Sequence, residues 1–117
     1  MDQHLQETIL NRRSIYAIGK DSPVSDEKIE EMVAFAIKHT PTAFNSQTGR
    51  VVLLLGKEHE ALWDLTEAEL RKVSSQTDFT ATEQKMAAFK NGYGTVLFFE
   101  DNDVVKGLQE KFPGYAD

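Results

Sequence analysis

The chain has 117 residues, 40% of them hydrophobic and 27% charged, which is the size and composition of one ordinary globular domain. Cysteine is absent, which excludes disulfides, thiolate chemistry and metal sites built on cysteine. The net charge is −6, whereas nucleic-acid-binding proteins more often carry a basic excess. We therefore expect one domain over residues 1–117 that has no nucleic-acid partner.

The sequence shows no segment suited to a membrane. Its longest apolar run, Val51–Leu55, is far shorter than a membrane span. The first ten residues show neither the basic region nor the cleavage-site pattern of a secretory signal. Together with the lack of cysteine, these features predict a cytoplasmic protein without a membrane partner.

Two helices are predicted before the first strand. The first covers residues 2–11. Ser25 is a favourable N-cap for the second, and Pro41 should end that helix near His39 or Thr40. Apolar residues on the second helix recur at i, i+3, i+4, i+7 and i+8, which predicts one buried face. These residues are Ile29, Met32, Val33, Ala36 and Ile37.

Two later segments are predicted to be strands of one sheet. Arg50–Leu55 and Thr95–Glu100 are apolar at nearly every step, which is typical of strands buried on both faces. Helices on both sides of the sheet would give a three-layer α+β arrangement. Two strands alone make a poor sheet, so we expect further chain or a partner to complete it.

Three further helices complete the prediction. A long helix is expected over residues 58–73 and another over residues 81–90, where Thr80 and Glu83 have the spacing of a capping box. Asn102 is expected to cap a short final helix.

The first candidate site is the segment NRRSIY, residues 11–16. Two adjacent guanidinium groups can bind phosphate oxygens in a bidentate way, and Ser14 adds a hydroxyl donor. Alternatively, Arg12 and Arg13 only complement the dipole at the end of the first helix. On spacing alone, this plainer interpretation is the stronger one.

The second candidate site is the segment PTAFNSQT, residues 41–48. It is longer than the usual connection of about 2 to 6 residues, and it is rich in hydroxyl and amide side chains. Such a row can bind a flat polar ligand. Alternatively, Asn45 and Gln47 only satisfy backbone groups of their own loop.

Other polar residues carry no recognisable site. His4, His39 and His59 are scattered without metal-binding spacing, so we expect surface histidines and no metal site. The predicted helix over residues 58–73 has an acidic set that we interpret as its solvated face. This set is Glu58, Glu60, Asp64, Glu67 and Glu69.

Taken together, three segments resemble the FMN-dependent nitroreductase family. RRSIY follows the first helix, TPTAFNSQ precedes the first strand, and TEQKMAAFKNGYGTVLFFED joins a helix to the second strand. The resemblance covers residues 8–117 and is closest to a small subgroup of NAD(P)H-dependent oxidoreductases. It implies a three-layer α/β/α nitroreductase-like fold, apparently truncated, because family members carry a second half with more strands.

The resemblance also implies an FMN site at the interface of a homodimer. The phosphate would be held by Arg12, Arg13 and Ser14, although Tyr16 stands where the family often has a further basic residue. The second loop would approach the flavin from the other subunit, with polar members on the ribityl chain and ring edge and apolar members on the ring. These positions are Thr42, Ala43, Phe44, Asn45 and Gln47.

A third element of the implied site is Lys85. It matches a basic residue that many relatives place near the flavin pyrimidine, where a cation stabilises reduced flavin. An ordinary exposed helix lysine is the alternative. Thr82 stands where relatives often have asparagine, so no role is carried over to it.

The implied activity is ping-pong electron transfer from NAD(P)H through FMN to a small-molecule acceptor such as a nitroaromatic or a quinone. The cofactor performs the redox chemistry, so no catalytic acid or base is expected. Two other classes stay open, namely a non-catalytic binder of flavin or phosphate and an interaction module.

Overall fold

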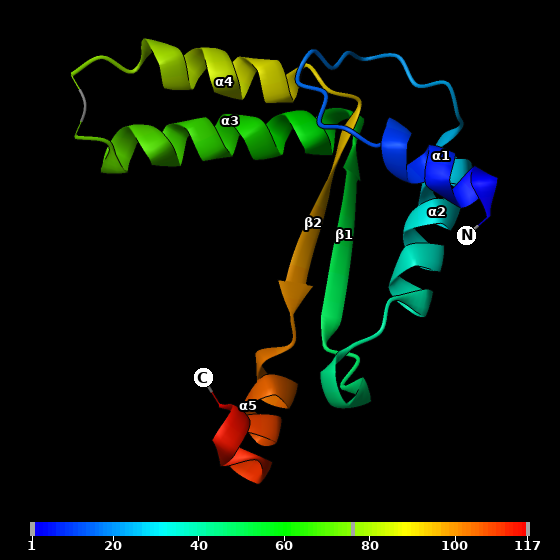
Figure 1. Cartoon of the computed structure of the whole chain (residues 1–117). Helices are drawn as coiled ribbons and strands as arrows, with labels where there is room; N and C mark the ends of the chain where they lie inside the picture. The colour runs from blue at the N-terminus through cyan, green and yellow to red at the C-terminus, as the bar shows by residue number, and fades with distance from the viewer. Residues whose placement is uncertain (1, 76, 117) are drawn as a thin grey trace.

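The sheet consists of two antiparallel strands far apart in the sequence. The computed structural model describes residues 2–75 and 77–116. Within them, β1 (Gly49–Leu55) pairs with β2 (Gly94–Glu100) along its whole length (Figure 1). Gly49 lies opposite Glu100, and Leu55 lies opposite Gly94. Both predicted strands are confirmed, each one residue longer at its start.

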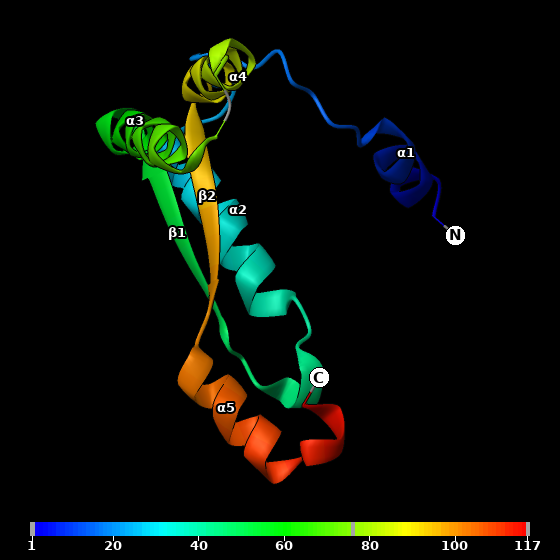
Figure 2. The ribbon, with the colours of Figure 1, turned by 90° about the vertical axis from the view of Figure 1, so that its left-hand side faces the viewer.

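Helix α2 (Asp26–His39) lies along one face of this sheet (Figures 1 and 2). Its start is the predicted one, because the Ser25 hydroxyl accepts a hydrogen bond of 3.2 Å from the backbone N–H of Lys28. Ile37 of the helix and Leu53 of β1 line the same shallow groove. The apolar periodicity of α2 therefore predicted the side that faces the strands.

Helices α3 (Gly56–Val73) and α4 (Thr80–Lys90) form an antiparallel pair, called the arm below, across one end of the sheet (Figures 1 and 2). The chain turns from β1 into α3 at Gly56, whose φ of 55° is strained for any residue with a Cβ atom. The arm is held by apolar and aromatic contacts, including Trp63 and Phe89 with ring centroids 4.9 Å apart. It begins on the sheet face opposite α2.

The predicted capping box of α4 does not form. Thr80 is the first helical residue, and its backbone N–H donates to the Asp78 carboxylate at 2.9 Å instead. Glu83 pairs with Arg71 of α3 at 3.2 Å, so it does not fold back onto its own helix start. Packing between the two helices of the arm thus displaces a local motif.

The final helix, α5 (Asn102–Lys111), is capped by Asp101 and not by Asn102 as predicted. The Asp101 carboxylate accepts from the backbone N–H of Asp103 at 3.2 Å. A short 3₁₀ turn, η2 (Pro113–Tyr115), follows. Capping one residue earlier lets Asp101 also pair with Arg50 beside the start of β1.

The described chain is open for its size. Its accessible surface is 9690 Å², whereas a compact monomer of the same mass exposes roughly 6,400 Å². The radius of gyration is 18.4 Å, against about 13 Å for a compact domain of this length. Among the described residues, Met86 is the only large apolar side chain that is buried, and it is still 7% exposed.

The prediction that both strands are buried on both faces is wrong, because the chain is open. Val52, Phe98 and Phe99 are 43%, 76% and 52% exposed, because α2 and the arm cover only part of the sheet. Helix α1 (Gln3–Asn11) stands apart from the sheet in both views (Figures 1 and 2). No helix within residues 2–75 and 77–116 is long and apolar enough to cross a membrane.

Candidate functional site

The loop between α2 and β1 has an unusual backbone. Phe44, Asn45 and Gln47 have φ values of 55°, 50° and 52°, and they are the only non-glycine residues of the described chain with positive φ. Asparagine tolerates this left-handed region, but a bulky phenylalanine there is a true outlier. Each such residue costs on the order of 1 to 3 kcal/mol, and such strain clusters at functional sites.

Backbone groups and one hydroxyl hold this loop. The N–H groups of Asn45 and Ser46 donate to the carbonyls of Thr42 and Ala43 at 3.0 and 3.1 Å, which forms the 3₁₀ turn η1 (Ala43–Asn45). The N–H of Gln47 donates to the Thr42 hydroxyl at 3.1 Å.

The side-chain amides of Asn45 and Gln47 are not used in this way. Both residues are exposed, and neither amide has a hydrogen-bond partner among residues 2–75 and 77–116. The alternative in which Asn45 and Gln47 only satisfy their own loop is therefore wrong. The Thr42 hydroxyl satisfies the loop backbone instead. The two side-chain amides, which have no partner in the described chain, can therefore bind another molecule.

The end of the loop is fixed to the end of β2. The buried Thr48 hydroxyl donates to the Glu100 carboxylate, and the Thr48 carbonyl accepts from the backbone N–H of Asp101 at 2.8 Å. Arg50 donates to the Gln47 carbonyl at 2.9 Å and pairs with Asp101 at 3.1 Å. The sequence did not predict this contact between Thr48 and Glu100, because the two residues lie 52 positions apart and meet only through the pairing of the strands.

Two hollows lie on either side of this loop. One, of about 650 Å³, is lined by Asn45 and Gln47 together with α2 and the start of β1. The other, of about 500 Å³, is lined by Ala43 and Phe44 together with α5 and η2. Both volumes are in the range of small-molecule sites.

The predicted phosphate-binding segment is fully accessible. Arg12 is the C-cap of α1, and Arg13 and Ser14 follow in non-helical backbone. All three are exposed, and within the described parts of the chain neither guanidinium forms an ion pair. The position at the end of α1 also suits the dipole interpretation, so the fold of one chain leaves both interpretations open.

One chain does not bring the predicted site residues together. The end of α1, the loop before β1 and helix α4 occupy three separate places in both views (Figures 1 and 2). Lys85 is exposed on α4, with its Nζ 5.9 Å from the centre of the Phe89 ring and no ion pair within the described residues. A site that uses all three segments has to be built from two chains or with further chain.

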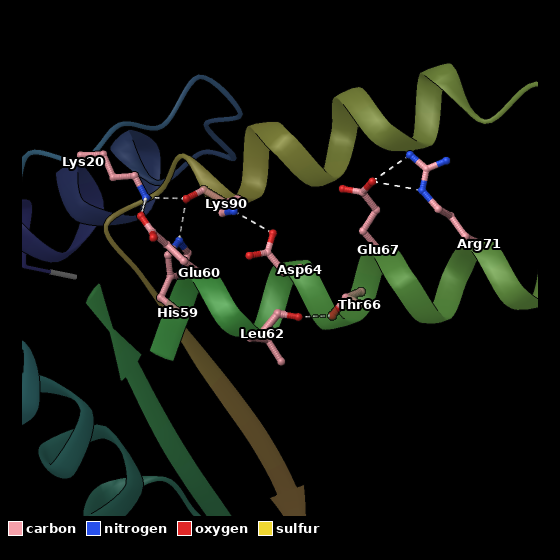
Figure 3. A network of polar contacts seen from close by, with 9 residues as sticks. All are labelled: Lys20, His59, Glu60, Leu62, Asp64, Thr66, Glu67, Arg71 and Lys90. Carbon is pink, nitrogen blue, oxygen red and sulfur yellow. Dashed lines mark hydrogen bonds and ion pairs between the residues drawn. The ribbon is translucent and has the colours of Figure 1, made fainter. Parts of the chain in front are cut away.

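A polar cluster at the base of the arm includes a histidine that the sequence analysis placed on the surface. His59 is only 1% exposed, while His4 and His39 are exposed as predicted. Its Nε2 lies 3.0 Å from the Lys90 carbonyl (Figure 3). Its Nδ1 lies 2.8 Å from the Thr95 hydroxyl. A signal was present, because His59 lies one turn before Trp63 on the same helix face.

Both ring nitrogens of His59 have hydrogen-bond partners. The Lys90 carbonyl can only accept, so Nε2 carries the hydrogen in that bond. Trp63 Nε1 donates to the Thr95 hydroxyl at 3.0 Å, and the same hydroxyl is the partner of Nδ1. Among the described residues, this network pairs the polar atoms of a buried histidine, which is a structural role.

Ion pairs surround the same cluster (Figure 3). Lys20 donates to Glu60 at 3.0 Å and lowers the pKa of that carboxyl, first through this hydrogen bond and then through its charge. Asp64 accepts from Lys90 at 2.7 Å and raises the pKa of that ammonium group. The acidic face of α3 is therefore partly paired with lysines, although surface pairs of this kind contribute little stability each.

This chain is similar to known proteins over most of its length. The model of the nitroreductase family matches residues 9–113. Nitroreductase FRM2 of Saccharomyces cerevisiae is 34% identical over 110 residues, which cover 92% of this chain and 54% of that protein.

Solved structures show the same relationship. Nitroreductase CinD from Lactococcus lactis, in complex with chloramphenicol, is 44% identical and superposes with a TM-score of 0.78 over 97% of this chain and 56% of its own. A nitroreductase from Saccharomyces cerevisiae is 30% identical, with a TM-score of 0.79 over 97% and 61% of the two chains. The predicted nitroreductase fold is thus confirmed, and this chain spans little more than half the length of these relatives.

Proposed function

This chain belongs to the nitroreductase family, and we propose that it forms part of an FMN-dependent oxidoreductase that transfers electrons from NAD(P)H to nitroaromatics, quinones or similar acceptors. The observation that carries the proposal is the strained loop whose Asn45 and Gln47 amides are exposed and unpaired within the described chain. CinD has also been crystallised with 4-nitrophenol, which supports the acceptor class.

The residues at the end of α1 fit a phosphate group. Arg12 and Arg13 offer two exposed guanidinium groups that no described carboxylate occupies, and Ser14 adds a donor. In a chain with net charge −6, such a free basic pair is a local exception. These residues would bind and orient the cofactor through its phosphate.

The loop before β1 fits the rest of a flavin. Asn45 and Gln47 would bond the polar edge of the ring system and the ribityl chain, with Thr42 holding the backbone that presents them. Ala43 and Phe44 would contact the ring. Lys85, exposed and without an ion pair in the described chain, would place a cation near the pyrimidine. FMN, when bound, would supply the hydride and electron chemistry.

We also propose that a second copy of the chain completes this site. Its three segments lie apart in one protomer, as Figures 1 and 2 show. The surface of 9690 Å² exceeds that of a compact monomer by roughly 3,300 Å². An obligate homodimer interface buries about 2,000 to 5,000 Å² summed over both partners, so dimerisation would cover part of the excess of each chain.

A flavin titration tests the proposal. A hydrogen bond to a charged group contributes about 1.5 to 3 kcal/mol, so Arg12→Ala should weaken FMN binding about ten- to a hundredfold. Ser14→Ala should have a smaller effect. Riboflavin, which lacks the phosphate, should bind more weakly and be nearly indifferent to Arg12→Ala. Lys106→Ala removes an exposed charge on α5 and serves as the control.

Three results would count against parts of this assignment. If the wild-type chain binds neither flavin, the cofactor is wrong. If Arg12→Ala leaves FMN affinity unchanged, or weakens riboflavin equally, Arg12 is only a helix-end charge. If FMN binds but NAD(P)H is not oxidised in the presence of a nitroaromatic or quinone, the chain is a flavin binder and not an enzyme by itself.

A further inference from the structure

We propose that Phe112 is a positioning residue that holds the flavin-facing loop, residues 42–47, in its left-handed conformation. The inference rests on the proposed function, because it assumes that this loop contacts the flavin. It adds a residue outside the segments predicted to bind the cofactor.

The contact is a stack of aromatic rings. The rings of Phe44 and Phe112 are nearly parallel, at 7°, with centroids 4.7 Å apart. Tyr115 meets Phe44 edge-on, with centroids 5.8 Å apart and planes at 72°. Figure 2 shows the C-terminal turn beside the loop that precedes β1. Both geometries are favourable for aromatic pairs.

The loop needs such a contact. Phe44 has a φ of 55°, a conformation that costs free energy and persists only when surrounding structure enforces it. The hydrogen bonds that Thr42 and Ala43 accept from the backbone N–H groups of residues 45–47 close the turn but do not involve the Phe44 side chain. The stack on Phe112 fixes that side chain and, through it, the backbone between Ala43 and Asn45.

The strand pairing brings Phe112 to this place. Because Asp101 is hydrogen-bonded to Thr48, α5 starts beside the end of the loop and returns its last turn toward Phe44. The η2 turn is tied to α5 by Gln109, whose side chain donates to the Ala116 carbonyl at 3.1 Å. Phe44 remains 57% exposed, so the stack leaves ring surface for a ligand.

The test compares Phe112→Leu with Phe112→Tyr in the whole chain. Leucine keeps apolar volume but removes the ring, whereas tyrosine keeps it. Phe35→Leu, an exposed aromatic on α2 that contacts His39, is the matched control. Two quantities are measured, namely hydrogen exchange at the Gln47 amide of the flavin-free protein and the affinity for FMN and riboflavin.

We expect Phe112→Leu to speed exchange at Gln47 and to weaken FMN and riboflavin equally, each by about tenfold. Equal loss for both flavins separates this residue from Arg12, whose removal should spare riboflavin. Phe112→Tyr should restore both quantities, and Phe35→Leu should leave them unchanged.

Unchanged exchange at Gln47, or unchanged flavin affinity, in Phe112→Leu would overturn the proposal. Faster exchange across the whole chain would also overturn it, because Phe112 would then be an ordinary packing residue. If the wild-type chain binds neither flavin, the proposed function fails. The exchange at Gln47 in the flavin-free protein then decides by itself whether Phe112 holds the loop.

Discussion

The arm and helix α1 are stabilised in opposite ways. In the arm, His59, Trp63 and Thr95 join α3 to β2 through partly buried hydrogen bonds, and Met86 is buried. Helix α1 has a side-chain cap at Asp2, but it stands apart from the body of the chain. Its apolar residues are exposed, namely Leu5 at 49%, Ile9 at 59% and Leu10 at 81%.

The difference bears on which part of the proposed site is preformed. A nine-residue helix is marginal in water, so we expect α1 to dock against something else. Arg12–Ser14 follow α1 directly, so we expect them to be positioned only when α1 docks. Lys85 lies in the arm, whose helices already pack on each other and on the sheet in one chain. Three substitutions test this contrast, and a fourth tests the junction of the loop with α5.

The largest effect is expected from His59→Ala in the arm. The substitution opens a cavity and leaves the Lys90 carbonyl and Thr95 hydroxyl without their buried partner, which should cost about 3 kcal/mol of unfolding free energy. Urea unfolding measures this loss. The exposed His39→Ala should change the free energy by less than about 0.5 kcal/mol. Equal effects of the two variants would refute the structural role of His59.

The next effect concerns Ile9→Glu in α1. In the proposed homodimer, a charge on the apolar face of α1 should raise the dissociation constant of the dimer about tenfold or more, because the charge must be desolvated on assembly. Sedimentation over a concentration series measures it. Gln3→Glu adds the same charge on the opposite side of the helix and should leave the constant unchanged. Were both variants as dimeric as wild type, α1 would not lie at the interface.

A smaller effect is expected where the loop joins α5. Asp101→Ala removes both the N-cap of α5 and the ion pair with Arg50, and should lower the unfolding free energy by about 1 kcal/mol. Asp101→Asn keeps a capping oxygen and loses only the charge, so it should recover most of this loss. If asparagine were as damaging as alanine, the ion pair and not the cap would be the important contact.

The smallest effect is a pH dependence from Glu60 at the base of the arm. Lys20 lowers the pKa of Glu60 in the folded chain. The pair therefore stabilises the fold above the unfolded-state pKa of Glu60. This contribution is lost as the pH falls through the lower folded-state pKa. Urea midpoints of wild type and Glu60→Gln should differ slightly at pH 7 and converge below about pH 4. A difference that grew in acid would contradict this assignment.

Much of the fold was determined by the sequence alone. Apolar runs placed β1 and β2 within one residue, and helical periodicity with the Ser25 cap placed α2 and the side that faces the strands, but none of its residues is buried. The family followed from three short segments in the right order. These features depend on neighbours within a few positions, where backbone preferences and side-chain alternation act directly.

Tertiary structure decided the rest, because it depends on which distant residues meet. Glu83 pairs with Arg71 and does not form the predicted capping box. His59 is buried because it contacts Thr95 and Lys90, which lie more than thirty residues away in the sequence. The left-handed Phe44 and its stack on Phe112 also arise from strand pairing that brings α5 beside the loop. Local sequence could identify the loop as polar and unusual, but only the folded chain shows that Thr42 closes it and that the Asn45 and Gln47 amides have no partner among residues 2–75 and 77–116.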